Sequence, residues 1–424
     1  MQIFILKRSL QEIMVDTKSS RILYIGPIPP EYGGIKSGGV ATYFWELTNY
    51  AHQAGYDVHL LTHLTKRCAD YPFDIISWPK DNFLLKTLKA LLQATRPTNS
   101  NIFLRYFGLK QKLIILYKRQ VMKKLIDDLK PDIIHVAQIF DPVVFSILSL
   151  HSRPPLVVTD HGVGMVLEGN LIEEYQLPPN PELWGALIKA VDRIVCVSRF
   201  AKEALLHHTN SFAYEQKMFA ILNPINEEKI KFYDKLNAKK KLNLPNLRTI
   251  LFVGVHLPFE KKGLGVLLKA FAEDECLKKN TTLLIVADPG TCIRIQRIIK
   301  GDLVNIHTIQ APAQNLDDCY NASDVFVMPS KLEGIGLAYY EALLSGVPII
   351  GYHKSVEELQ SALNLYIGEK YNSEFEGAVE LAEKIKKVLD MEINREALRK
   401  AVIEHLSWKV KFREYGELYD SLLT

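Results

Sequence analysis

Short apolar runs that end at glycine or proline recur along the chain and alternate with amphipathic stretches. The run "RILYIGPIPP" (21–30) predicts a buried strand that enters a loop. The following stretch "ATYFWELTNYAHQAGY" places Phe44, Leu47 and Ala51 on one helical face. A second strand is predicted at "DVHLLTH" (57–63), and three further apolar runs continue the alternation: "PDIIHVA", "PPLVVTDHG" and "VDRIVCVS".

The same order restarts near residue 248. "RTILFVGV" predicts a strand, "GLGVLLKAFAEDECL" (263–277) one helix, and "TTLLIVAD" (281–288) the next strand. Later buried strands are predicted at "VNIHTI", "DVFVMPS" and "VPIIGY". Strands that alternate with helices form parallel sheets covered on both faces. We therefore expect an α/β protein with two Rossmann-like, doubly wound domains, whose ligands bind beyond the carboxyl ends of the strands.

The chain length of 424 residues agrees with two domains. We expect a loosely docked extension over 1–20, a first domain over 21–226, a second over 227–407 and a final helix over 408–424. The seam should lie in the lysine-rich, proline-punctuated stretch 223–246.

Composition excludes several classes of protein. The net charge of +4 is too small and too mixed to indicate nucleic-acid binding. The five cysteines have neither disulfide nor metal spacing, which fits a reducing cytoplasm. No export leader is visible, and no segment reaches the roughly 18 apolar residues of a spanning helix.

The segment "PSKLEGIGLAYYEALLSGVPII" (329–350) holds the strongest chemical signal. Glu333 is expected in a loop and Glu341 one turn inside the following helix. Free N–H groups at Gly334, Ile335 and Gly336, together with the helix dipole, would form a phosphate site. A carboxylate before this point could bind sugar hydroxyls, and one beyond it a ribose. The alternative is that Glu333 only complements the helix dipole and that Glu341 is solvated.

The longer segment "DCYNASDVFVMPSKLEGIGLAYYEALLSGVPII" resembles the donor-site signature of retaining nucleotide-sugar glycosyltransferases with the GT-B fold, the E-x7-E type of group 1 and family 4. The resemblance extends over most of the chain. It includes the glycine loop at Gly38 and Gly39 and the motifs "DIIHV", "VTDHG" and "DRIVCVSRFAKEAL".

This resemblance implies roles for individual residues. Glu341 would bind the donor's ribose and Glu333 the transferred sugar. Lys262 would neutralise the leaving diphosphate, and His161 would contact the donor sugar or the acceptor region. The donor-binding set would be Gly38, Gly39, Lys262, Glu333, Gly334, Ile335, Gly336, Leu337 and Glu341, with the amides of Gly39 and of Gly334 to Gly336 on the pyrophosphate.

Fixed dipoles and an ammonium would stabilise the leaving group, so neither a metal nor a cofactor is expected. Without the resemblance, His161 could be a histidine hydrogen-bonded at a strand end, Lys262 a solvated lysine and Gly38–Gly39 an ordinary turn.

Two departures keep other functions open. Val255 and His256 follow Gly254 where the family usually has an arginine, and "LNPIN" stands in place of the common N-G-V-D. The alternatives are a binding or assembly subunit without turnover, and a GT-B-like epimerase of nucleotide sugars.

The acceptor side is expected in the first domain. Residues 83–130 mix lysines and arginines with large apolar residues, which is typical of helices that rest on an anionic membrane but also of helices packed on a sheet. The membrane interpretation of these helices predicts peripheral contact with the inner face of the membrane and a glycan, polysaccharide or lipid-linked acceptor, for a protein that the cysteine pattern places in the cytoplasm. The family resemblance implies that the final helix, with Trp408, Phe412, Tyr415 and Leu418 at helical spacing, crosses back to the first domain.

Overall fold

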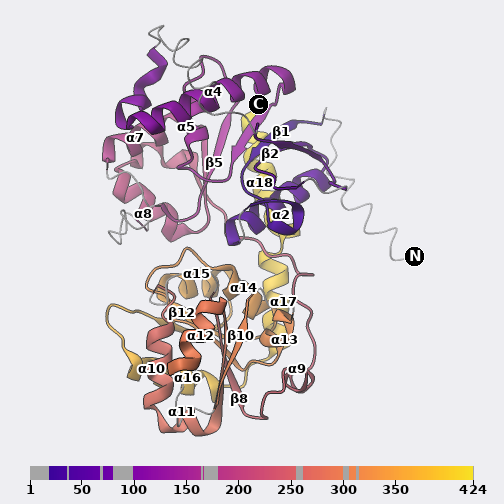
Figure 1. Ribbon diagram of the computed structural model, residues 1–424, viewed down its shortest axis with the longest axis vertical. Coiled ribbons are helices and arrows are strands. Elements are labelled where there is room, and N and C mark those ends of the chain that lie inside the picture. Colours follow the sequence, from indigo (N-terminus) through magenta and orange to yellow (C-terminus); the bar gives the residue numbers. More distant parts are fainter. Residues whose placement is uncertain are drawn as a thin grey trace, which may run out of the picture.

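A computed structural model describes residues 19–35, 38–66, 70–79, 99–163, 166, 180–254, 261–298, 305–311 and 315–423. It contains two α/β units, which lie one above the other in Figure 1. The first has a seven-stranded sheet in the order β3-β2-β1-β4-β5-β6-β7, and the second a six-stranded sheet in the order β10-β9-β8-β11-β12-β13. Neighbouring strands run parallel, as in β1 with β2 and in β8 with β9. The predicted fold class of two doubly wound parallel-sheet domains is confirmed.

The strands of the first sheet are short. They are β1 (Arg21–Ile25), β2 (Asp57–Thr62), β3 (Asp74–Ser77), β4 (Ile133–Val136), β5 (Leu156–Asp160), β6 (Arg193–Cys196) and β7 (Met218–Ala220). The helical segments between them are η1 (Pro30–Tyr32), α2 (Gly39–Gln53), η2 (Asn99–Tyr106), α4 (Leu109–Leu129), α5 (Pro142–Leu148), α7 (Pro181–Ala190), α8 (Arg199–Thr209) and η3 (Phe212–Lys217).

Both faces of the first sheet are covered. Leu23 and Ile25 of β1 contribute to one apolar cluster, whereas Ile22 and Tyr24 contribute to another. This alternation is the two-residue period of a strand buried on both sides. The sheet is therefore a rigid support whose polar loops emerge at the carboxyl ends of its strands.

The second domain begins with α9 (Lys235–Lys241). Its strands are β8 (Arg248–Gly254), β9 (Thr281–Ala287), β10 (Ile306–Gln310), β11 (Val325–Met328), β12 (Ile349–Tyr352) and β13 (Gly368–Tyr371). Its other helices are α10 (Leu264–Glu273), α11 (Glu275–Asn280), α12 (Pro289–Ile298), α13 (Leu316–Asn321), α14 (Leu337–Leu344), α15 (His353–Leu363), α16 (Ala378–Leu389) and α17 (Arg395–Leu406).

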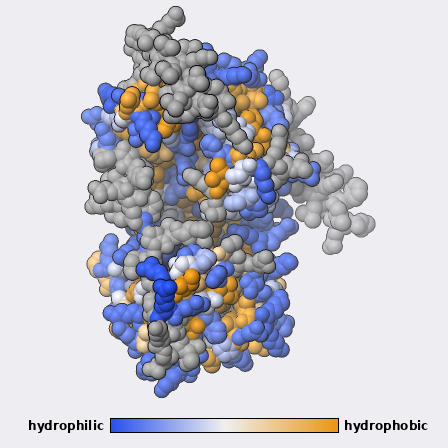
Figure 2. Space-filling model, in the orientation of Figure 1, coloured by the Kyte–Doolittle hydropathy of each residue, from blue (hydrophilic) through white to orange (hydrophobic). Residues whose placement is uncertain are grey.

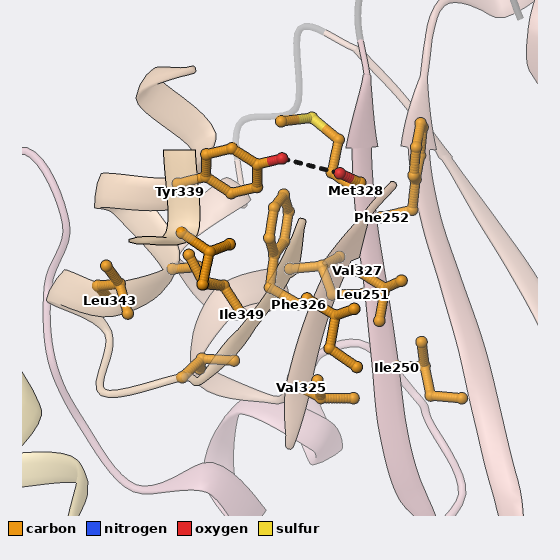
Figure 3. Packing of buried hydrophobic residues seen from close by; sticks show 14 of the residues in the cluster. Ile250, Leu251, Phe252, Val325, Phe326, Val327, Met328, Tyr339, Leu343 and Ile349 are labelled. Carbon is orange, nitrogen blue, oxygen red and sulfur yellow. Dashed lines mark hydrogen bonds between the residues drawn. The ribbon is translucent and has the colours of Figure 1, made fainter. Parts of the chain in front are cut away.

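Figure 3 shows how the core of this domain fixes the start of α14. Phe326 of β11 packs between Tyr339 of α14 and the neighbouring strand β8. The Tyr339 hydroxyl donates a 2.8 Å hydrogen bond to the Met328 carbonyl at the end of β11. The loop from 329 to 336 is therefore tied at both of its ends.

The single helix expected over 263–277 is wrong. The helix is interrupted at Asp274, which has extended dihedral angles and separates α10 from α11. The Asp274 carboxylate accepts a 2.9 Å hydrogen bond from the Leu277 amide and a 2.7 Å bond from Lys386 Nζ. Aspartate is a strong helix N-cap. Its bond with the Leu277 amide starts a new helix, so α10 does not continue through Asp274.

The chain crosses between the domains twice, and the two crossings lie side by side. The Ile225 amide donates to the Leu406 carbonyl at 2.9 Å, and the Trp408 amide donates to the Ile225 carbonyl at 3.2 Å. After the second crossing, α18 (Trp408–Leu423) packs on the first domain beside α2 (Figure 1, yellow). Its buried aromatic residues belong to the same apolar cluster as Tyr24 and Phe44.

The described surface mixes polar and apolar residues over both domains, as Figure 2 shows. Across the described ranges, no helix is both long enough and apolar enough to span a bilayer. Helix α4 packs against α5 and buries Ile115, Leu116 and Met122. Residues 83–98 of the predicted membrane-facing region lie outside the described ranges.

Candidate active site

Two helix N-termini meet where the two domains face each other. Gly38, which has a positive φ of 122° that favours glycine, precedes α2, and Gly336 precedes α14. A methyl group added at Gly39 would lie 3.5 Å from Cδ1 of Leu337, so the two helix starts almost touch. Each helix N-terminus presents free N–H groups and the positive end of its dipole. An anion between them would be bound from both domains.

The strand-end loop of His161 completes this junction. A methyl group added at Gly334 would lie 3.4 Å from the His161 carbonyl oxygen. The structure therefore brings His161, Gly39, Gly334 and Leu337 together, although they come from three separate parts of the sequence.

The His161 ring is held in one orientation. Burial lowers its pKa to about 4, although a hydrogen bond to the Ala137 backbone opposes this shift. The edge of the Tyr43 ring packs on it, with 5.2 Å between the ring centroids. Nε2 is buried and has no hydrogen-bond partner, so the bond to Ala137 engages Nδ1. At neutral pH the ring is uncharged, and Nε2 is free to accept a hydrogen bond from a ligand hydroxyl.

Glu333 and Lys262 form an ion pair through Oε2 and Nζ. Their side chains are 13% and 17% exposed, so Lys262 is not a solvated lysine. The loop before α10 is pressed against the end of β11, since any side chain at Gly263 would collide with the Pro329 carbonyl, 2.1 Å away. This packing holds Lys262 beside Glu333.

Glu341 is buried, with 7% of its surface exposed, rather than solvated. Its Oε1 is 2.5 Å from Lys229 Nζ, and its Oε2 accepts a 2.7 Å hydrogen bond from the Tyr320 hydroxyl. Burial by itself would lower the pKa of Lys229, but Glu341, with smaller contributions from Glu46 and Glu31, outweighs that effect and raises it. Sequence reasoning missed Lys229 and Tyr320, and the only signal was the position of Lys229 in the predicted seam.

Ile335 has an unusual backbone conformation. Its φ is 86°, which is rare for a β-branched residue, and its side chain is 3% exposed. Asn223 Nδ2 donates to its carbonyl at 3.4 Å. Strained residues of this kind concentrate at binding sites.

A cavity of about 340 Å³ opens beside Gly38 and Gly39 at the carboxyl ends of β1, β2 and β4. Trp78, Lys118 and Asp141 lie on its wall. Lys118 Nζ is 3.0 Å from Asp141 Oδ1 and 4.9 Å from the centroid of the Trp78 ring. The positions of the missing arginine, Val255 and His256, lie outside the described residues.

Two family profiles match the chain. The family described as Glycosyltransferase Family 4 matches residues 37–229, and Glycosyl transferases group 1 matches residues 234–405. A D-inositol 3-phosphate glycosyltransferase of Segniliparus rotundus is 29% identical over 208 residues, which are 46% of this chain and 45% of the relative. A second such enzyme, from Catenulispora acidiphila, is 25% identical and matches over 65% of this chain and 68% of its own length. The chain thus spans less than half of the first relative.

Solved structures with the same two-domain architecture cover nearly the whole chain. The sucrose-phosphate synthase of Thermosynechococcus elongatus superimposes with a TM-score of 0.71 at 20% identity, over 95% of this chain and 99% of that one. An Anabaena protein in complex with UDP-glucose has a TM-score of 0.65 at 14% identity, over 94% and 99%. Together with the two parallel sheets, these similarities confirm the GT-B fold.

Proposed function

Because this chain belongs to the glycosyltransferases of family 4 and group 1, we propose that it moves a sugar from a nucleoside-diphosphate sugar to an acceptor hydroxyl. The observation that carries the proposal is the meeting of the N-termini of α2 and α14 across the cleft, with Glu333, Lys262 and His161 around them. A diphosphate between these helices would be bound by backbone amides of Gly39 and of Gly334 to Gly336.

The ion pair of Lys262 and Glu333 supports separate roles for the two residues in donor binding: Lys262 on the diphosphate and Glu333 on the sugar. The two charges compensate each other in the ion pair. A diphosphate would take the ammonium as its partner, which would release Glu333 to accept hydrogen bonds from the sugar hydroxyls. His161 Nε2 would accept a hydrogen bond from another sugar hydroxyl, and Glu341 would accept hydrogen bonds from the ribose.

Cleavage of a glycosyl–phosphate bond places negative charge on the departing diphosphate. The two helix dipoles and Lys262 would stabilise that charge as it forms, without a metal. We propose that transfer retains the anomeric configuration, on the strength of the E-x7-E signature alone.

The cavity at Trp78 and Asp141 is the proposed acceptor side, because it opens beside Gly39 in the first domain. A glycan, a growing polysaccharide or a lipid-linked sugar would bind there. For a lipid-linked acceptor we propose contact with an anionic membrane through residues 83–130. Sedimentation with anionic vesicles at low and physiological salt tests this contact, and negligible binding at both would exclude it.

The decisive experiment is a donor screen. The purified chain is incubated with individual nucleotide sugars and a cell extract, and products are identified by mass spectrometry and their anomeric configuration by NMR. We expect one donor to be consumed, with E333Q and K262M lowering kcat at least 100-fold. A control substitution in α10, K269M, should leave turnover unchanged, because the Lys269 side chain is 64% exposed.

The same screen separates the other functions. Donor conversion without any acceptor would indicate an epimerase. Tight donor binding by calorimetry without turnover would indicate a binding subunit. If no nucleotide sugar binds, the proposal fails.

A further inference from the structure

Lys229 occupies a position that the donor roles above do not explain. It follows the first crossing between the domains, and its main chain is held there by a 3.1 Å hydrogen bond to the Asn226 carbonyl. The side chain reaches into the second domain, where Nζ lies 2.5 Å from Glu341 Oε1. Three parts of the molecule therefore meet at one ammonium: the crossing, α14 and, through the adjacent acidic groups, the first domain.

Glu46 of α2 provides the link to the first domain. Its Oε2 accepts a 3.4 Å hydrogen bond from Asn226 Nδ2. Burial raises the pKa of Glu46, while Asn226 and the charge of Lys229 oppose this rise. Lys229 is thus paired with Glu341 of the second domain, and its charge also interacts with Glu46 and Glu31 of the first domain.

The contacts of Glu341 leave a defined number of hydrogen-bond acceptor positions for a ligand. Each carboxylate oxygen has two lone pairs. Lys229 occupies one on Oε1, and Tyr320 occupies one on Oε2. One acceptor position remains on each oxygen, which matches the two neighbouring hydroxyls of a ribose.

We propose that Lys229 is a positioning residue for the donor's ribose, which it serves by fixing the Glu341 carboxylate in one orientation with one lone pair on each oxygen available. This inference rests on the proposed function. Lys229 does not touch the donor itself. Because Lys229 lies at the crossing, ribose binding is coupled to how the two domains are placed relative to each other.

The test compares ribose recognition by K229M and the unsubstituted chain. The probes are the nucleoside diphosphate of the accepted donor and its 2′-deoxy and 3′-deoxy analogues, measured by calorimetry. The unsubstituted chain should prefer the ribose form at least tenfold, and K229M should lose most of this preference. K229R, which keeps the charge, should restore part of it. K231M, which replaces an exposed lysine two residues away, should behave like the parent chain.

A second comparison distinguishes positioning from a merely structural role. K229R keeps a cation that can hold the Glu341 carboxylate, whereas K229Q does not. K229R should therefore recover part of the ribose preference, and K229Q should lose it as K229M does. If K229M does not fold, K229Q carries the same measurement.

The outcomes are separable. If the parent chain binds nucleotide sugars and K229M keeps the full preference for ribose, the inference is wrong while the proposed function stands. If the parent chain binds no nucleotide sugar, the proposed function fails and the inference fails with it.

Discussion

Ile335 combines a left-handed backbone with a buried, β-branched side chain. A conformation of this kind costs about 1–3 kcal/mol, and the surrounding packing must hold it. Replacement by leucine conserves volume and removes the branch at Cβ. We therefore expect the free energy of unfolding of I335L to be about 1 kcal/mol higher than that of I349L, the matched change in β12.

Chemical denaturation of both variants measures this difference. Ile349 is a suitable reference because it is fully buried in a regular strand. Equal losses in the two variants would show that the backbone at Ile335 carries no strain.

Buried His161 predicts how stability depends on pH. Its pKa is lowered to about 4, so the unfolded chain binds the proton more readily between pH 6.5 and pH 4. Stability due to this group is present above pH 6.5 and is lost as the pH falls. From pH 7.5 to pH 5 the loss is about 2 kcal/mol.

Neighbouring Asp160 acts in the opposite direction. Burial raises its pKa to about 6, so protonation of this carboxyl favours the folded state as the pH falls through that value. The sum is therefore best dissected with H161Q, whose unfolding free energy should fall less between pH 7.5 and pH 5 than that of the parent chain. An unchanged slope in H161Q would contradict the lowered pKa.

The E-x7-E spacing singles out both glutamates as candidate site residues, because a loop carboxylate and a helical one flank three residues with free amides. It does not reveal their partners. Lys229 and Glu341 are 112 residues apart, and no local pattern marks such a pair. The motif around Lys262 indicates its role, but its pairing with Glu333 depends on how β8 and β11 lie in the sheet.

At the scale of elements, the break at Asp274 is open to test. D274A removes the N-cap of α11 and the bond to Lys386, and it should destabilise the second domain by about 1–2 kcal/mol. The thermal transition of that domain measures the loss. The control E275A removes only a surface pair with Lys278 and should leave the midpoint unchanged. Equal midpoints in D274A and the parent chain would contradict the capping role.

Buried strands were predictable and marginal ones were not. The strands β1, β5 and β9 are apolar along most of their length because helices cover both faces. By contrast, β7 has three residues, and β13 is an edge strand with the sequence GEKY. Charged residues on an edge strand prevent further pairing, and they also remove the apolar signal.

The whole molecule depends on α18 more than its place at the end of the sequence indicates. Trp408, Phe412, Tyr415 and Tyr419 complete an apolar cluster of the first domain. The Tyr419 hydroxyl also lies 2.7 Å from His135 Nδ1. The aromatic spacing predicted a helix with one buried face, but its partner followed only from the family resemblance.

Deletion of residues 408–424 should therefore disrupt the first domain and spare the second. The cluster of the second domain contains no residue of α18. Calorimetry should show one domain transition lost or lowered by more than about 10 °C, and limited proteolysis should cut first within residues 21–220. A chain lacking only residues 423–424 is the control. Two unchanged transitions after the larger deletion would refute this dependence.

The paired crossings at Ile225 and Ser407 restrict the motions available to the two domains. Both covalent links pass from one half to the other at a single edge, bridged by backbone hydrogen bonds. A doubled hinge lets the halves swing about one axis but opposes sliding and twisting. Each domain closure should therefore return the N-termini of α2 and α14 to the same relative position. Groups from both domains that act together would then be aligned every time the domains close.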